Sequence, residues 1–363
     1  MARFVQCARS LAPVPGLRYR SCPWRTLPRT ASGTLSVVPN DCIALPQAYN
    51  PHNHRSHGGS VQRGLSAAIA AAAGFNVCGA ADKRYSLGLE RITPVFKLQK
   101  LSNYGTSTPA VARTLPQGSE LLSFFTGTDA QKERCKGVLM ELSRHLVRCV
   151  EICERVTGEI DQGLASIATD GLQFQSHGRV VTLPSVADLH SQAEAFLQSA
   201  KLAIRETARL AEPFYEVRHD HKFHRFAAWS QEKFGADDPF TKMIQDWEPW
   251  VKAIVSMRNA VDHPEDKPGG KLVVHNFRLI EPPNEVSVLE PMWGLSGGSE
   301  SPIRADMASA IEGITQLGES VLVELFYKFK PPFPLVVIEI PEKDRDPSFP
   351  KRLRVGLASE APA

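Results

Sequence analysis

Residues 240–264, FTKMIQDWEPWVKAIVSMRNAVDHP, are the stretch that decides the fold of this chain. Their apolar side chains recur at intervals of four, three, four and three, the spacing of one face of an α-helix, at Phe240, Ile244, Trp247, Val251 and Ile254. The next position on this face is Arg258, whose guanidinium is costly to bury without an anion or a hydrogen-bond partner. The end of this helix is therefore the first place to look for a functional site.

The helix is expected to end at or near His263, because a residue that precedes proline is disfavoured in the α conformation and Pro264 follows. Inside a continuous helix, five residues would separate the side chains of Arg258 and His263 by roughly 140°. Once the chain leaves the helix, the imidazole can turn towards the guanidinium. We therefore expect Arg258 and His263 to share one small site.

The sequence Arg258-Asn259, followed by His263, resembles the signature of the HEPN superfamily of small all-α proteins, many of which are metal-independent ribonucleases. The family signature is an arginine, usually followed by a polar residue, and a histidine four to six residues later. The resemblance covers about residues 120–330 in helical architecture but only these few residues in motif. It implies a helical bundle that cleaves RNA without a metal or another cofactor.

The resemblance also implies roles for single residues. His263 would act as general base or general acid, because histidine titrates near neutral pH. Arg258 would hold the scissile phosphate with its planar fork of donors, and Asn259 would orient the phosphate or the imidazole. Asp262 or Glu265 would fix the histidine tautomer. Family members commonly form homodimers, and some act beside an antitoxin in toxin–antitoxin systems, so RNA, a second copy and an antitoxin are the partners implied.

A second interpretation keeps the HEPN-like fold without the chemistry. In it, Arg258 satisfies carbonyl groups at the helix C-terminus, helped by the macrodipole, and His263 caps a turn. The chain would then be a catalytically inactive module for binding or dimerisation.

Residues 219–224, HDHKFH, form the densest histidine cluster of the chain. His219, His221, Lys222 and His224 are candidates for a substrate groove, because positively charged loops flanked by aromatic rings suit RNA. A third interpretation of the protein is a helical metalloprotein that uses His219, His221 and His224. The spacing matches no recognised metal-binding motif, so we assign no metal.

The rest of the pattern is mainly helical. A long amphipathic helix is expected over about residues 129–167. Gly158 and Gly163 are the two positions at which it could be interrupted. A second helix begins after Asp188 as N-cap, and a last one spans residues 303–329. These helices predict an antiparallel bundle of the HEPN type.

Short extended segments follow the motif. Residues 271–280 and 285–289 flank a proline-rich turn and predict a β-hairpin. Residues 291–302 are expected to form a loop. A strand at residues 334–341 would join the hairpin, and residues 342–363 would be a charged tail.

The expected domain organisation has three parts: a disordered N-terminal segment at residues 1–115, a HEPN-like helical domain at 116–330 with the hairpin at about 271–290, and a short strand with a charged tail at 331–363. Residues 1–80 contain eight Arg, no Lys and a single acid, a composition typical of disorder. It also fits a mitochondrial transit peptide. A further interpretation is that this stretch is not a natural part of the protein and reflects a misplaced start, since no Met lies between Met1 and Met140.

Composition and motifs argue against several classes of protein. A net charge of +3 and 42% hydrophobic residues are ordinary for a globular protein. Seven cysteines without a C-x-x-C pair argue against a disulfide framework and for a cytoplasmic protein. No apolar run reaches the length of a membrane span. The phosphate-binding loops and serine-hydrolase elbows of other enzyme classes are absent from the sequence.

Overall fold

The structure is a computed structural model that describes residues 75–77, 98–100, 102–175, 180–218, 222–262, 270–280 and 287–360. Helices make up most of these described residues. The helices are α2 (Pro109–Thr114), α3 (Pro116–Ser123), α4 (Asp129–Asp170), α5 (Leu189–Arg209), α6 (Glu212–Tyr215), α7 (Phe223–Phe234), α8 (Pro239–Asp262) and α9 (Ile303–Phe329). The expectation of a mainly helical fold is confirmed, and the strands form small antiparallel sheets.

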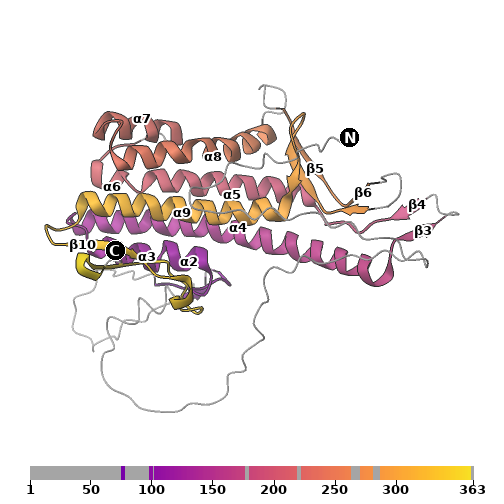
Figure 1. Ribbon diagram of the computed structural model, residues 1–363, viewed down its shortest axis with the longest axis horizontal. Coiled ribbons are helices and arrows are strands. Elements are labelled where there is room, and N and C mark those ends of the chain that lie inside the picture. The colour runs from indigo at the N-terminus through magenta and orange to yellow at the C-terminus, as the bar shows by residue number, and fades with distance from the viewer. Residues whose placement is uncertain are drawn as a thin grey trace, which may run out of the picture.

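The four long helices α4, α5, α8 and α9 lie side by side along one axis and alternate in direction, as the chain colours in Figure 1 show. Helix α5 packs against α4, α8 and α9, so it is central to the bundle. Helix α7 covers the outer side of α8, and α2 and α3 cover α4 and α9 on the opposite side (Figure 1). One continuous apolar core runs through all these helices.

Helix α4 begins with a capping box. The Thr128 hydroxyl accepts a hydrogen bond from the backbone N–H of Gln131, and the Gln131 side chain accepts one from the backbone N–H of Thr128. The helix then runs to Asp170 without a break, so neither Gly158 nor Gly163 interrupts it.

Gly163 of α4 is needed for packing. A Cβ atom built there would lie 2.9 Å from the ring of Phe277, which belongs to the segment after the bundle's third long helix. Only a glycine lets this ring approach α4 so closely. At the start of α5, Asp188 holds the expected N-cap position, but its φ of 46° is left-handed and its side chain makes no capping hydrogen bond.

The segment after α8 contains more strands than the single hairpin that the sequence predicts. Strand β6 (Arg278–Ile280) pairs with β7 (Ser287–Leu289), which confirms a hairpin within the predicted region. The segment expected to be a loop, residues 291–302, instead contains two further strands. They join β5 in a second antiparallel sheet of β5 (Leu272–His275), β8 (Met292–Leu295) and β9 (Ser301–Pro302).

This second sheet packs against one end of the bundle. Trp293 of β8 is 2% exposed, and its indole N–H donates to Asp306 of α9 at 2.9 Å. Burial of an indole requires such a partner for its N–H. The loop prediction was wrong because the sequence pattern around Trp293 is short, and its anchor lies in a different helix.

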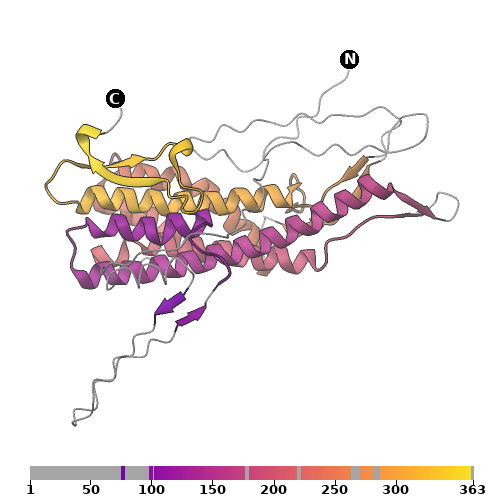
Figure 2. The ribbon, with the colours of Figure 1, turned by 90° about the horizontal axis from the view of Figure 1, so that it is seen from below.

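The C-terminal strand also pairs differently from our prediction. Strand β10 (Leu335–Glu339) confirms the strand predicted at residues 334–341, but its partner is β11 (Leu353–Leu357) and not the hairpin. The expected charged tail therefore contains a strand. This pair of strands lies along α9, near α3, at the end of the bundle opposite β6 (Figures 1 and 2).

The ordered region starts before residue 116. Helix α2 falls inside the segment expected to be disordered, and its residues Ala110, Val111 and Ala112 are buried in the bundle. The remainder of the N-terminal prediction lies mostly outside the described residues. A two-stranded antiparallel pair, β1 (Phe75–Val77) with β2 (Leu98–Lys100), is also present. In the part of the chain that the structure describes, no helix has the length and apolar character to cross a bilayer.

Candidate functional site

Helix α8 buries the face that the sequence predicted. The five side chains of that face are between 0% and 6% exposed: Phe240, Ile244, Trp247, Val251 and Ile254. Arg258 is the next position on the face, and its side chain is 19% exposed. The core therefore ends one turn before Arg258, and the guanidinium lies at the edge of the bundle.

The guanidinium of Arg258 has two partners. Its Nε donates to Oε1 of Gln198 on α5 at 2.7 Å, and its Nη1 forms an ion pair with Oδ2 of Asp262 one turn further along α8. The position opposite Arg258 on α5 is thus an amide and not an apolar side chain. The contact surface between α5 and α8, which we call the seam, changes from apolar to polar at Arg258.

Asn259 makes a second contact across the same seam. Nζ of Lys201 on α5 donates to Oδ1 of Asn259 at 3.1 Å, and the contact is partly buried. Gln198 and Lys201 are three residues apart on α5, so they lie about one turn apart on one face of that helix. We call Gln198, Lys201, Arg258, Asn259 and Asp262 the seam cluster.

The end of α8 agrees with the sequence prediction to within one residue. The helix stops at Asp262, directly before His263. His263 and Glu265 lie outside the described residues, so the predicted approach of the imidazole to Arg258 stays a prediction. Asp262, expected to orient the imidazole, is paired with Arg258.

The histidine cluster is described only in part. His219 and His221 lie outside the described residues. Lys222 is the N-cap residue of α7, and His224 lies in the first turn of that helix with an exposed side chain. Among the residues that the structure does describe, no group of three or more His, Cys, Asp or Glu side chains is placed to hold a metal ion.

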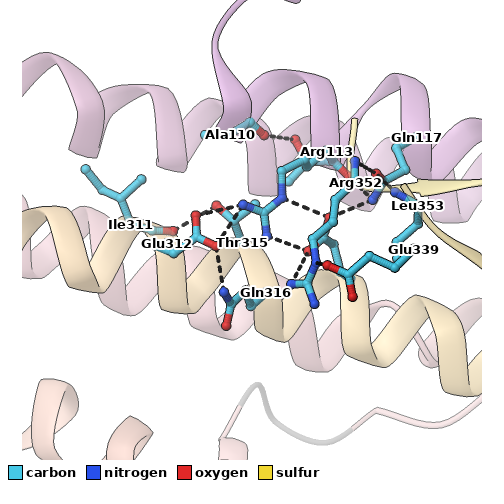
Figure 3. A network of polar contacts seen from close by, with 12 residues as sticks. Ala110, Arg113, Gln117, Ile311, Glu312, Thr315, Gln316, Glu339, Arg352 and Leu353 are labelled. Carbon is cyan, nitrogen blue, oxygen red and sulfur yellow. Dashed lines mark hydrogen bonds and ion pairs between the residues drawn. The ribbon is translucent and has the colours of Figure 1, made fainter. Parts of the chain in front are cut away.

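A second polar cluster, which the sequence did not reveal, lies between α2, α3, α9 and the C-terminal strands (Figure 3). Its centre is Glu319 of α9, which is 4% exposed. The Glu319 carboxylate accepts hydrogen bonds from Arg113 Nε at 2.9 Å, Arg113 Nη2 at 2.5 Å and Gln117 Nε2 at 2.7 Å. We call this cluster the Glu319 network.

The Glu319 network ties α2, α3 and the C-terminal strands to α9. Gln117 Oε1 accepts hydrogen bonds from the backbone N–H groups of Arg352 and Leu353 at 2.6 and 2.8 Å, which fixes β11 to α3. The Arg352 guanidinium lies 3.5 Å from Glu319 and also donates to Glu339 of β10 at 2.9 Å. These contacts explain why a segment rich in charge is ordered.

Arg113 stays protonated in this buried site. Burial alone would lower the pKa of Arg113, but hydrogen bonds and charges from Glu319 and Glu312 outweigh burial and raise the pKa above its ordinary value. Since each charged group has a partner of opposite charge, the Glu319 network is a structural cross-link. One signal was present in the sequence: Glu312 and Glu319 are seven apart, which places both on one face of the last helix.

The seam cluster is therefore the candidate site. Two cations, Lys201 and Arg258, lie there beside two amides at a partly exposed helix end, and the sequence places His263 immediately after Asp262. Donors of this kind suit a phosphate group. No model of a known family, no curated protein and no solved structure matches this chain significantly.

Proposed function

We propose that this chain is a metal-independent endoribonuclease of the HEPN type, with its active site at the C-terminal end of α8. One observation carries the proposal. The last turn of α8 takes Arg258 and Asn259 out of the core and sets them against polar side chains of α5, and the helix stops at the residue before His263. A histidine can transfer the protons, and an arginine with an amide can stabilise the phosphate charge, in cleavage of RNA without a metal.

In the proposed reaction, His263 removes the proton from a ribose 2′-hydroxyl group, and the 2′-oxygen attacks the neighbouring phosphorus. The bond from phosphorus to the 5′-oxygen breaks, and that oxygen takes a proton from a general acid. The products are a 2′,3′-cyclic phosphate and a free 5′-hydroxyl group. Arg258 stabilises the negative charge that builds up on the phosphorane oxygens.

Asn259 and Lys201 act together in this scheme. The Lys201 ammonium donates to the Asn259 side-chain oxygen at 3.1 Å, which leaves the amide N–H₂ group of Asn259 directed away from that contact. The amide then supplies a neutral donor and the ammonium a second positive charge near the phosphate. One histidine does not serve as base and acid in the same step, so a second copy of the chain supplies the other proton-transfer group.

The test is cleavage of a 5′-labelled RNA in the presence of EDTA. Arg258→Met and His263→Ala should each reduce the cleavage rate by about 100-fold or more, the usual contribution of a proton-transfer or oxyanion group. His190→Ala is the matched control, because His190 is an exposed histidine of α5 whose imidazole lies 3.1 Å from Glu194 of the same helix. It should retain the rate of the unmodified protein. Cleavage at the unmodified rate by both site variants would refute the proposal.

A second candidate is a catalytically inactive HEPN-like module for binding or dimerisation. The observation that favours it is that Nε and Nη1 of Arg258 already have partners within the chain, Gln198 and Asp262. This candidate predicts a dimer by light scattering without any cleavage of RNA. It also predicts that His263→Ala leaves dimerisation unchanged.

A further inference from the structure

The contacts of Arg258 restrict how it can bind a phosphate. A guanidinium offers two edges for bidentate binding, one formed by Nε with Nη2 and the other by Nη1 with Nη2. Gln198 occupies Nε and Asp262 occupies Nη1. Each edge therefore contains one nitrogen that already has a partner, and a bidentate phosphate competes with Gln198 or with Asp262 for Arg258.

Asp262 is the partner that opposes a phosphate. Gln198 is neutral, so a phosphate beside it meets no charge repulsion. Asp262 carries a negative charge, and a phosphate on Arg258 would lie next to it. Like charges at such a distance raise the free energy of the bound state.

Asp262 is also the partner more easily displaced. It is the last residue of α8, where the negative end of the helix dipole disfavours a carboxylate. Its side chain is 36% exposed, so water can take over its hydrogen bonds when it leaves Arg258. A partly exposed ion pair between residues four apart on a helix is weak.

We propose that Asp262 is an intramolecular competitor of RNA phosphate for Arg258, an autoinhibitory contact that holds the site closed until a polyanion displaces it. This inference rests on the proposed function, since it assumes that Arg258 binds phosphate. It assigns Asp262 the opposite effect from a residue that assists catalysis by orienting His263. Neutralising Asp262 therefore strengthens RNA binding.

The experiment measures binding of a fluorescent 2′-O-methyl RNA by anisotropy at about 0.1 M salt. This probe lacks the attacking hydroxyl group and stays intact. Asp262→Asn should bind about three to ten times more tightly than the unmodified protein, because two unit charges about 4 Å apart interact by about 1 kcal/mol where water screens them. The gain should shrink as salt is raised, because the repulsion is screened.

Asp246→Asn is the matched control. It makes the same change of charge on an exposed residue of the same helix, 16 residues away. This separation corresponds to about 24 Å along the helix, more than twice the screening length at this salt concentration. Asp246→Asn should leave affinity nearly unchanged. A gain equal to that of Asp262→Asn would show a general effect of net charge and would overturn the inference.

Arg258→Met separates the inference from the function on which it rests. Arg258→Met should bind weakly, and adding Asp262→Asn to it should give no gain, because there is no guanidinium left to release. A gain of the same size without Arg258 would overturn the inference. Unchanged or weaker binding by Asp262→Asn alone, while Arg258→Met loses affinity, would overturn it and leave the function standing. Equal affinity of the unmodified protein, Asp262→Asn and Arg258→Met would overturn both.

Discussion

Replacing Glu319 by Gln removes one charge from the buried network that joins α2, α3, α9 and the C-terminal strands. The substitution keeps the size of the side chain but replaces one of the two carboxylate oxygens that accept the Arg113 hydrogen bonds. It also brings an N–H₂ group towards the donors of Arg113 and Gln117. Arg113 is 6% exposed, so water does not replace the lost partner.

The expected loss of stability follows from the charges. Two unit charges about 4 Å apart attract each other by about 4 kcal/mol at an effective dielectric constant of about 20. Breaking a buried pair by removing one partner typically costs about 3–5 kcal/mol. Arg113 keeps its contact with Glu312, which is 2.7 Å away but more exposed. We therefore expect Glu319→Gln to lower the free energy of unfolding by about 3 kcal/mol.

The assay is urea unfolding followed by circular dichroism at 222 nm. The matched control is Glu141→Gln, which removes an ion pair with Arg144 on the surface of α4, where the two side chains are 39% and 68% exposed. The control should change stability by less than about 0.5 kcal/mol. A double-mutant cycle with Arg113→Met should give a coupling energy of about 2 kcal/mol. A loss for Glu319→Gln no larger than that of the control would refute the reasoning.

Further predictions concern pH and glycine packing. Burial raises the pKa of Tyr215 to about 12, so stability should fall as pH rises from about 10 to about 12, and Tyr215→Phe should flatten this fall in urea unfolding. Gly158 lies inside α4 with open space around it, so Gly158→Ala should stabilise the protein by about 0.5–1 kcal/mol. In Gly313→Ala the new methyl group would clash with the ring of Trp250, so the same assay should show a loss of about 1–3 kcal/mol.

The sequence predicted those parts of the fold that depend on local spacing. The apolar face of α8 could be identified because its side chains recur with the helical period. The end of α8 could be identified because Pro264 disfavours continuation of the helix. Arg258 stood out because it occupies a position on that face where an apolar residue is expected. The long helices α4 and α9 were predictable for the same reason.

Contacts between distant segments were not predictable from spacing. Lys201 and Gln198 belong to the seam cluster only because α5 packs against α8. The sequence of α5 alone does not indicate that these two side chains face α8. Arg113 and Glu319 are 206 residues apart in the chain. The pairing of β10 with β11 was missed because the charges around Arg352 resemble those of a solvated tail. In the structure, the Glu319 carboxylate of α9 pairs with the Arg352 guanidinium, and the Gln117 side-chain oxygen of α3 accepts a hydrogen bond from the Arg352 backbone N–H.

The central claim is that Arg258 and His263 act on the same phosphate, and single-turnover cleavage of RNA in EDTA tests it most directly. The four proteins to compare are the unmodified chain, Arg258→Met, His263→Ala and the double variant. Groups that act as a unit are strongly non-additive, so each single variant should lose about 100-fold or more and the double variant hardly more than the worse single variant. Losses that multiply in the double variant, or single variants that cleave at the unmodified rate, would contradict the account.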